Sequence, residues 1–228
     1  ANMVLCVSRD TEQRYKSLTS FQSDNSRVIY NTYRDIFVPG DRLAARHSMD
    51  LTDEFVILTV ARLDDRDGYK GHDRIIRALP KLSRANKVKY LVAGAGPDKE
   101  RLAALADELS VKSSVRFLGR VSDEQLVRLY QAADLFALPS TGEGFGIVFI
   151  EAMACGTPAI GINVGGASEA LAGGELGYCV ELSEFESFIV NSPDLPDVDR
   201  TELARTVCRR FGRDRFNSSV SRAVNDLL

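Results

Sequence analysis

The sequence predicts an α/β protein with a doubly wound, parallel sheet of six strands. From residue 54 onward, short apolar runs typical of buried strands alternate with longer stretches whose apolar residues recur at helical spacing. Most of these runs end in a glycine-rich turn. The chain has 228 residues, of which 44% are hydrophobic and 27% charged, so it can bury a sizeable core and does not have the composition of a disordered segment.

Six runs are predicted as the strands because each is short, apolar and bounded by turn residues: 55–60, 89–93, 115–118, 135–138, 158–162 and 178–180. Between them, residues 72–84 and 123–133 have the period of amphipathic helices. The residues on the apolar faces are Ile75, Ile76, Leu79 and Leu82 in the first helix and Leu126, Leu129 and Tyr130 in the second.

Residues 1–50 do not follow this alternation. A strand at 2–7, a polar helix, a loop rich in serine and asparagine, and an apolar run at 28–30 precede Pro39 and Gly40, and we interpret them as a tail and linker. The last helix of the chain must pack its apolar stripe against another surface. That stripe consists of Phe216, Val220, Ala223, Val224, Leu227 and Leu228.

Charge and cysteine content exclude several classes of function. The net charge of -3 lacks the basic excess that duplex DNA requires, so nucleic acid is not an expected partner. Cys6, Cys155, Cys179 and Cys208 form no CxxC pair and have no histidine at metal-ligand spacing, so neither a zinc site nor a disulfide framework is indicated. No apolar run reaches the length of a membrane span. We therefore expect a reduced, cytoplasmic protein.

The turns after the predicted strands are the candidate binding loops, because ligands of open α/β sheets bind at the carboxyl ends of the strands. Arg62 follows the first strand, and Lys70 and Gly71 come eight residues later, at the start of a helix. After the second strand, Gly94 fits either a backbone conformation that the turn itself requires or a close approach to a phosphate. A dinucleotide site is not indicated, because the acidic residue expected about 20 positions further on is missing.

The turn after the fourth strand is the most informative. It contains Glu143, and Glu151 follows in a helix predicted to begin near Gly146. Eight helical positions span roughly two turns, so both carboxylates are predicted to face one crevice. The amide groups of Phe145, Gly146 and Ile147 at the helix N-terminus suit a phosphate, whereas the carboxylates suit hydroxyl groups, a combination that a nucleotide sugar offers. Because this helix is otherwise apolar, Glu151 needs a polar partner.

Several segments of the chain together match one family. They are Arg62 with Lys70-Gly71-His72-Asp73, Gly94-Ala95-Gly96-Pro97, Val115-Arg116-Phe117-Leu118-Gly119, Leu138-Pro139-Ser140, Glu143-Gly144-Phe145-Gly146, Glu151-Ala152-Met153-Ala154-Cys155-Gly156-Thr157-Pro158 and Gly165-Gly166. This set resembles the donor-binding, C-terminal half of family 4 retaining glycosyltransferases, which have the GT-B fold with Rossmann-like domains. The resemblance extends over about residues 1–228, and the glutamate pair is its most specific part.

The resemblance implies how the reaction would proceed. Glu151 would bind the ribose hydroxyls and Glu143 the hydroxyls of the transferred sugar, while Arg62 and Lys70 would neutralise the diphosphate as it leaves. No divalent metal or other cofactor is expected, because the two cations and the helix dipole stabilise the developing charge. Retention would occur by front-face attack, with the leaving phosphate taking the proton of the acceptor, so no carboxylate nucleophile is expected.

The resemblance also implies the substrates. The donor is expected to be a nucleotide diphosphate sugar, with uridine favoured over guanosine as the base, and the acceptor a saccharide or lipid-linked molecule of polysaccharide biosynthesis. The further residues expected to contact the donor are Gly94, Arg120, Val121, Phe145, Gly146 and Ile147, with Arg120 and Val121 next to the base.

A two-domain organisation follows from the same resemblance. Residues 1–40 are expected to be a remnant of an N-terminal acceptor domain and its hinge, 41–212 the donor-binding domain, and 213–228 a helix that returns to the N-terminal domain. Without that partner domain, the apolar stripe of the last helix would be exposed and would favour self-association. The parent enzyme is expected to associate peripherally with a membrane.

Three other hypotheses remain open from the sequence. The chain would be a nucleotide-sugar-binding module without turnover of its own, or a sugar-nucleotide epimerase on the same scaffold. A metal-dependent enzyme would use one of two DxD patterns, Asp65-Arg66-Asp67 or Asp197-Val198-Asp199, although both lie in polar loops where aspartates are usually solvated.

Overall fold

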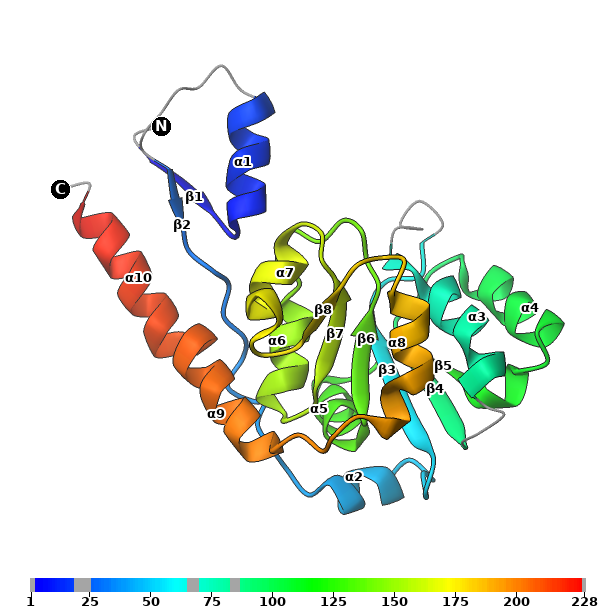
Figure 1. Cartoon of the computed structure of the whole chain (residues 1–228). Helices are drawn as coiled ribbons and strands as arrows, with labels where there is room; N and C mark the ends of the chain where they lie inside the picture. The colour runs from blue at the N-terminus through cyan, green and yellow to red at the C-terminus, as the bar shows by residue number, and fades with distance from the viewer. Residues whose placement is uncertain (1–2, 19–25, 65–69, 83–86, 227–228) are drawn as a thin grey trace.

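The computed structural model describes residues 3–18, 26–64, 70–82 and 87–226 and confirms the α/β prediction (Figure 1). A six-stranded sheet has the order β5-β4-β3-β6-β7-β8 with all neighbours parallel, and β1 and β2 form a separate parallel pair. The strands are β1 Val4–Cys6, β2 Ser26–Val28, β3 Phe55–Val60, β4 Val88–Ala93, β5 Val115–Gly119, β6 Leu135–Leu138, β7 Ala159–Ile162 and β8 Tyr178–Val180.

The described helices lie between and after these strands. They are α1 Arg9–Leu18, α2 Arg42–His47, α3 His72–Leu82, α4 Lys99–Glu108, α5 Asp123–Ala132, α6 Ile147–Ala154, α7 Gly166–Ala170, α8 Phe185–Asn191, α9 Arg200–Phe211 and α10 Arg213–Asn225. Each of the six predicted strands agrees with the structure to within one residue at either end. The helices predicted at 72–84 and 123–133 correspond to α3 and α5.

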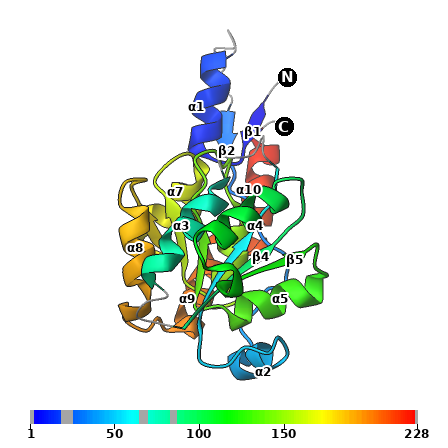
Figure 2. The same ribbon diagram turned by 90° about the vertical axis from the view of Figure 1, so that its right-hand side faces the viewer.

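Helices cover both faces of the six-stranded sheet (Figures 1 and 2). Alternate residues of β3 enter different cores: Val56 and Leu58 pack with α2, α5, α6, α7 and α9, whereas Ile57 packs with α3, α4 and α8. All three side chains are fully buried. Burial on both faces explains why the central strands read as continuous apolar runs, and it leaves only the strand ends open to polar ligands.

In the described part of the N-terminal segment, interpreted above as a tail and linker, the elements follow in the order β1, α1, β2. β1 and β2 pair in parallel, and α1 connects them. The backbone amides of Arg9 and Asp10, at the start of α1, donate to the Glu169 carboxylate of α7 at 2.9 and 3.2 Å. The contact is favourable because a helix N-terminus attracts negative charge. The Thr11 hydroxyl also donates to the carbonyl of Gly144 at 3.2 Å. The unit is therefore anchored to the loops at the carboxyl ends of the main sheet.

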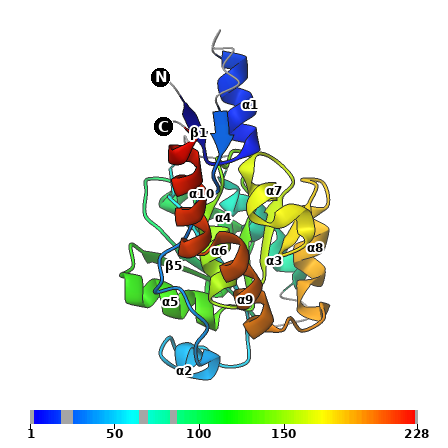
Figure 3. The same cartoon turned by 90° about the vertical axis from the view of Figure 1, so that its left-hand side faces the viewer.

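The last helix is only partly exposed. α10 leads from α9 toward β1 and β2 (Figure 3). Of the predicted stripe, Ala223 is buried, Phe216 and Val220 are half-buried, and Val224 is 46% exposed. Leu227 and Leu228 lie outside the described residues. The expectation of an uncovered stripe thus holds for Val224 but not for Ala223.

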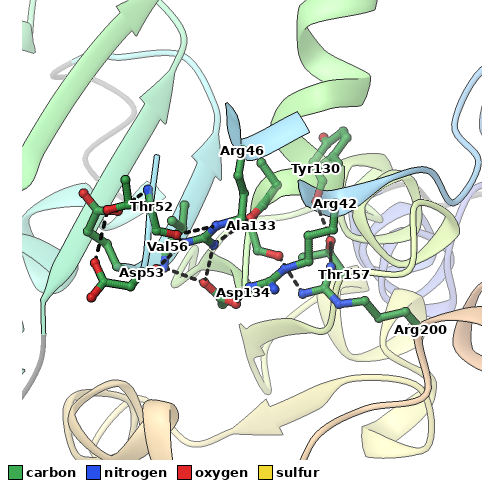
Figure 4. Close-up of polar contacts among 12 residues, drawn as sticks. Arg42, Arg46, Thr52, Asp53, Val56, Tyr130, Ala133, Asp134, Thr157 and Arg200 are labelled. Carbon is green, nitrogen blue, oxygen red and sulfur yellow. Dashed lines mark hydrogen bonds and ion pairs between the residues drawn. The ribbon is translucent and has the colours of Figure 1, made fainter. Parts of the chain in front are cut away.

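One ionic cluster fixes the amino-terminal ends of the central strands (Figure 4). The Asp134 carboxylate, just before β6, accepts the Val56 amide of β3 at 2.8 Å and the Arg46 guanidinium of α2 at 3.0 Å. It also accepts Arg42 of the same helix. Arg46 is only 5% exposed and donates to the carbonyl groups of Thr52 and Ala132 as well. One carboxylate therefore joins α2, β3 and β6.

Among the described residues, no helix has both the length and the apolar character needed to cross a lipid bilayer.

We expect Asp134→Asn to lower the free energy of unfolding by about 3 kcal/mol, because Arg46 is then buried without its carboxylate. Urea denaturation followed by circular dichroism measures the change as a shift of the midpoint at constant slope. Asp53→Asn is the matched control, since it removes an ion pair with Lys87 in which both side chains are exposed, and its midpoint should stay close to that of the unmodified chain. Equal midpoints for the two variants would contradict the structural role of the Asp134 cluster.

Candidate functional site

A cavity of about 420 Å³ opens at the carboxyl ends of β3 and β6. These two strands are adjacent in the sheet, and the chain leaves β3 toward β4 on one side before it returns to β6 on the other. Such a switch point is where ligands of open α/β sheets bind. The cavity is lined by Arg62 and Lys70 from the β3–α3 connection and by Glu143 with residues 144–148 from the β6–α6 connection. Six predicted site residues thus line one cavity: Arg62, Lys70, Glu143, Phe145, Gly146 and Ile147.

The Lys70 ammonium and the Glu143 carboxylate form an ion pair inside this cavity. Nζ of Lys70 lies 2.6 Å from Oε1 of Glu143. The side chains are 14% and 11% exposed, so water screens the pair weakly. The two residues are 73 positions apart in the chain, and the pair joins the β3–α3 and β6–α6 connections. The cavity therefore holds one cation and one anion in direct contact, next to the exposed Arg62.

Close packing fixes the start of α3 beside this pair. Gly71 has a φ of +76°, and a Cβ at this position would lie 2.6 Å from the carbonyl oxygen of Pro139, so only glycine allows the approach. The buried imidazole of His72 lies 3.3 Å from the carbonyl oxygen of Arg62 and 3.3 Å from the hydroxyl of Tyr90. Burial lowers the pKa of His72, which favours the neutral ring. His72 thus has a structural role, because its ring contacts the Arg62 turn and Tyr90.

The β6–α6 loop is held in the same way from the other side. The Gly166 amide donates to the carbonyl of Glu143 at 2.9 Å, and a Cβ on Gly166 would lie 2.1 Å from the carbonyl oxygen of Gly144. Gly146 caps α6 in the left-handed region, with a φ of +85°. The helix begins at Ile147, so the amide groups of its first turn have no partner within the helix and are oriented toward the cavity end of α6.

Glu151 occupies a different environment from Glu143. Because α6 begins at Ile147, Glu151 is one turn into the helix, and the prediction that eight helical positions align it with Glu143 is wrong. Glu151 is not among the described residues that line the cavity. Its carboxylate instead accepts a hydrogen bond of 3.0 Å from the hydroxyl of the fully buried Tyr130. Tyr130 is the polar partner that a glutamate in an apolar helix requires.

Burial raises the pKa of Glu151, while the Tyr130 hydroxyl and the charge of Arg34 oppose that rise. Arg34 comes from the segment before α2 and forms a bidentate ion pair with Asp123 at the start of α5. The half-buried carboxylate of Glu151 therefore accepts the Tyr130 hydroxyl and is stabilised by the charge of Arg34. That combination leaves a lone pair of the carboxylate available to hydroxyl groups of a ligand.

Three further residues predicted to contact the donor lie at the carboxyl ends of other strands of the sheet. Gly94, Arg120 and Val121 are not among the described residues that line the cavity. The amide of Gly94 donates to the carbonyl of Gly119 at 2.8 Å, and a Cβ on Gly94 would lie 1.8 Å from the carbonyl oxygen of Ala61. Packing between two turns therefore explains this glycine. Arg120 is exposed and Val121 half-buried after the edge strand β5, and their contact with a base stays a prediction.

Sequence reasoning missed contributions from the N-terminal segment and from α5. Val7 and Asn31 line the cavity although both lie in the part interpreted as a tail and linker. Tyr130 was assigned only to an apolar helix face. A signal existed for Tyr130, because a buried glutamate requires a donor, whereas nothing in the local pattern around Val7 or Asn31 indicates a site.

The two DxD patterns have different outcomes. Asp65-Arg66-Asp67 lies outside the described residues. In the other pattern, Asp199 caps α9 by accepting the amides of Thr201 and Glu202 at 3.0 and 2.9 Å. Within the described ranges, no three His, Cys, Asp or Glu side chains gather in a way that would hold a metal ion.

A larger cavity, of about 480 Å³, lies at the opposite, amino-terminal ends of the strands. Its lining includes Arg42, Asp134, Asp197 and Arg200. Asp134 pairs with Arg42, and Arg200 donates to the hydroxyl of Thr157 and the carbonyl of Ala133 at 3.2 and 2.7 Å. The smaller cavity is the better candidate for a ligand site because it lies at the carboxyl ends of the strands, at the switch point of the sheet.

Comparisons with known sequences agree with the geometry. Residues 42–189, more than half of the chain, match the model of a family described as Glycosyl transferases group 1. A D-inositol 3-phosphate glycosyltransferase from Mycolicibacterium smegmatis is 37% identical over 235 residues, which cover 95% of this chain and 52% of that protein. A protein of the same name from Mycobacterium tuberculosis (strain F11) is 42% identical over 153 residues, covering 64% of this chain and 30% of its own length. The chain spans about half the length of the first of these curated relatives.

Solved structures share the fold. The crystal structure of Anabaena Alr3699/HepE in complex with UDP and glucose superposes with a TM-score of 0.85 at 23% identity, covering 99% of this chain and 64% of that one. Sucrose-phosphate synthase from Thermosynechococcus elongatus superposes with a TM-score of 0.75 at 27% identity, covering 99% of this chain and 56% of that one.

We expect Tyr130→Phe to raise the pKa of Glu151 further, because the variant removes a hydrogen bond that stabilises the carboxylate. Carbon-detected NMR of the glutamate carboxyl groups during a pH titration measures this pKa. Tyr90→Phe is the control, since it removes an equally buried hydroxyl that contacts Thr59 and His72 instead. A Glu151 titration that is the same in both variants would show that Tyr130 does not control this carboxylate.

Proposed function

Because the chain belongs to the group 1 glycosyl transferase family, we propose that it is the donor-binding half of a glycosyltransferase. The protein of which it is part would move a sugar from a nucleotide diphosphate sugar to a saccharide or lipid-linked acceptor. One observation supports this assignment above all: a cation and a carboxylate, Lys70 and Glu143, meet in a cavity at the switch point of the sheet, beside a helix N-terminus. A diphosphate is bound by a cation such as Lys70, and sugar hydroxyls donate to a carboxylate such as Glu143.

The contacts of the donor follow from this arrangement. Lys70 and Arg62 would bind the diphosphate together with the first amides of α6, because all of them line one cavity. Glu143 would accept hydroxyl groups of the sugar and Glu151 those of the ribose. We favour a uridine diphosphate sugar, and the complex of HepE with UDP and glucose supports that choice for a protein of the same fold. A guanosine diphosphate sugar fits the same groups.

The reaction is proposed to retain the configuration of the transferred sugar. The bond between the anomeric carbon and the diphosphate oxygen breaks while the acceptor oxygen attacks from the same face, and the acceptor's proton passes to the leaving phosphate oxygen. Negative charge grows on the diphosphate in the transition state, where two cations and the positive end of α6 stabilise it. No step needs a metal ion in this scheme.

The acceptor would bind outside the donor cavity. We propose residues 1–40 as part of an acceptor domain and its hinge, 41–212 as the donor domain, and 213–228 as the helix that returns to the acceptor domain. Val7 and Asn31 line the donor cavity, which supports an acceptor side formed by the N-terminal segment. Because the chain spans about half of its curated relatives, the second candidate function is nucleotide-sugar binding without turnover by this chain alone.

A screen of melting temperature against nucleotide sugars tests donor binding. A ligand present at 100 times its dissociation constant should stabilise the chain by about 2.7 kcal/mol. We expect Glu151→Ala and Arg62→Ala to abolish most of that shift, because each removes a charged contact with the donor. Lys81→Ala, which breaks an exposed ion pair with Glu186, is the control and should keep the full shift. If no nucleotide sugar shifts the transition, or if both site variants keep the shift, the assignment is wrong.

Binding is also expected to be independent of divalent metal. The affinity for the nucleotide sugar, measured by calorimetry, should be the same with excess EDTA and with added Mg²⁺ or Mn²⁺. A loss of affinity in EDTA that Mn²⁺ restores would favour the metal-dependent hypothesis, with Asp65 and Asp67 as candidate metal ligands.

A further inference from the structure

The ion pair in the donor cavity joins two groups that the proposed function assigns to different ends of one ligand. Lys70 would hold the diphosphate and Glu143 the sugar, yet their side chains lie 2.6 Å apart here and are both largely buried. The Lys70 ammonium has three N–H donors, but a phosphate that joined it while Glu143 stayed in contact would place two anions side by side in a weakly screened cavity. Donor binding therefore includes the separation of a buried ion pair.

We propose that the Lys70–Glu143 ion pair makes this site select an intact nucleotide sugar over the free nucleoside diphosphate. The proposal rests on the proposed function. With the intact donor, both charges find new partners, the diphosphate for Lys70 and the sugar hydroxyls for Glu143. With the free diphosphate, Lys70 finds a partner, but Glu143 is left buried without its Lys70 contact and without sugar hydroxyls, which is costly in a weakly screened cavity.

Close backbone packing keeps Glu143 in the cavity when Lys70 moves to a phosphate. Its carbonyl accepts the Gly166 amide at 2.9 Å, and the backbone of Gly144 packs so closely on Gly166 that not even a Cβ fits between them. Gly71, next to Lys70, also packs closely, because a Cβ there would lie 2.6 Å from the carbonyl oxygen of Pro139. This packing on both sides favours separation of the pair by movement of its side chains, with Glu143 remaining in the cavity.

The same pair would help the product to leave. After transfer the sugar hydroxyls move away with the acceptor, and Glu143 again competes with the nucleoside diphosphate for Lys70. The re-formed ion pair displaces the diphosphate. Glu143 thus acts as a specificity-determining residue as well as a contact for the sugar.

A double-mutant cycle measured by calorimetry tests the proposal. The ligands are the nucleoside diphosphate, UDP or GDP, that shifts the melting temperature more, and the corresponding nucleotide-glucose. In Glu143→Gln we expect the diphosphate to bind about tenfold more tightly, because the Glu143 carboxylate no longer competes with the phosphate for Lys70 and no buried carboxylate is left behind. The nucleotide-glucose should gain less, because the amide is a weaker acceptor of sugar hydroxyls than the carboxylate.

The Lys70→Ala background distinguishes an effect of Glu143 that acts through the ion pair from direct repulsion between Glu143 and the diphosphate. If Glu143 weakens diphosphate binding only through Lys70, then Glu143→Gln has no effect when Lys70 is absent. A tenfold gain that persists in Lys70→Ala would show long-range repulsion instead and overturn the proposal. Glu175→Gln, which removes an exposed carboxylate paired with Arg210, controls for the change in net charge and should leave both affinities unchanged.

The outcomes distinguish this inference from the proposed function. Binding by the unmodified chain with no gain in Glu143→Gln overturns the role of the ion pair and leaves donor binding intact. Absence of binding of UDP, GDP and their sugars to the unmodified chain overturns both.

Discussion

Burial of the parallel sheet on both faces is the constraint on which the rest of this structure depends. Helices cover the central strands so completely that side chains such as Ile57 and Leu58 have no exposed surface. The two ionic arrangements described above lie at opposite ends of these strands. At the amino ends, Asp134 joins α2 to β3 and β6 and belongs to the framework. At the carboxyl ends, Lys70 and Glu143 meet in a cavity and are available to a ligand.

The two arrangements differ in how their charges are satisfied. Around Asp134, guanidinium groups also donate to backbone carbonyls, so a ligand could enter only by breaking several contacts. The Lys70–Glu143 pair is a contact between two flexible side chains, while glycines pack closely against the backbones on either side. The site thus combines a fixed backbone with side chains that can exchange partners, as binding of an anionic ligand requires.

The sequence predicts the frame of the sheet well and the site less completely. Buried parallel strands read as short apolar runs, which is why all six were located to within one residue. Lys70 and Glu143 were identified as separate candidates, but their contact depends on packing across 73 positions and has no local signature. α6 begins at Ile147, as expected from the sequence, but Glu143 lies in the turn before it, so the positions between Glu143 and Glu151 are not all helical and the predicted alignment was wrong. Asn31 was missed because its position in the site comes from tertiary docking of the N-terminal unit.

A crystal structure of this chain with a bound uridine diphosphate sugar would test the proposed donor site. We expect the diphosphate to lie in the cavity between β3 and β6, with Nζ of Lys70 within hydrogen-bond distance of a phosphate oxygen. The Glu143 carboxylate should then contact the sugar hydroxyls, and the ion pair should be broken. A nucleotide sugar bound away from this cavity, or bound in it while Lys70 and Glu143 remain in contact, would show that the ion pair is not part of donor binding.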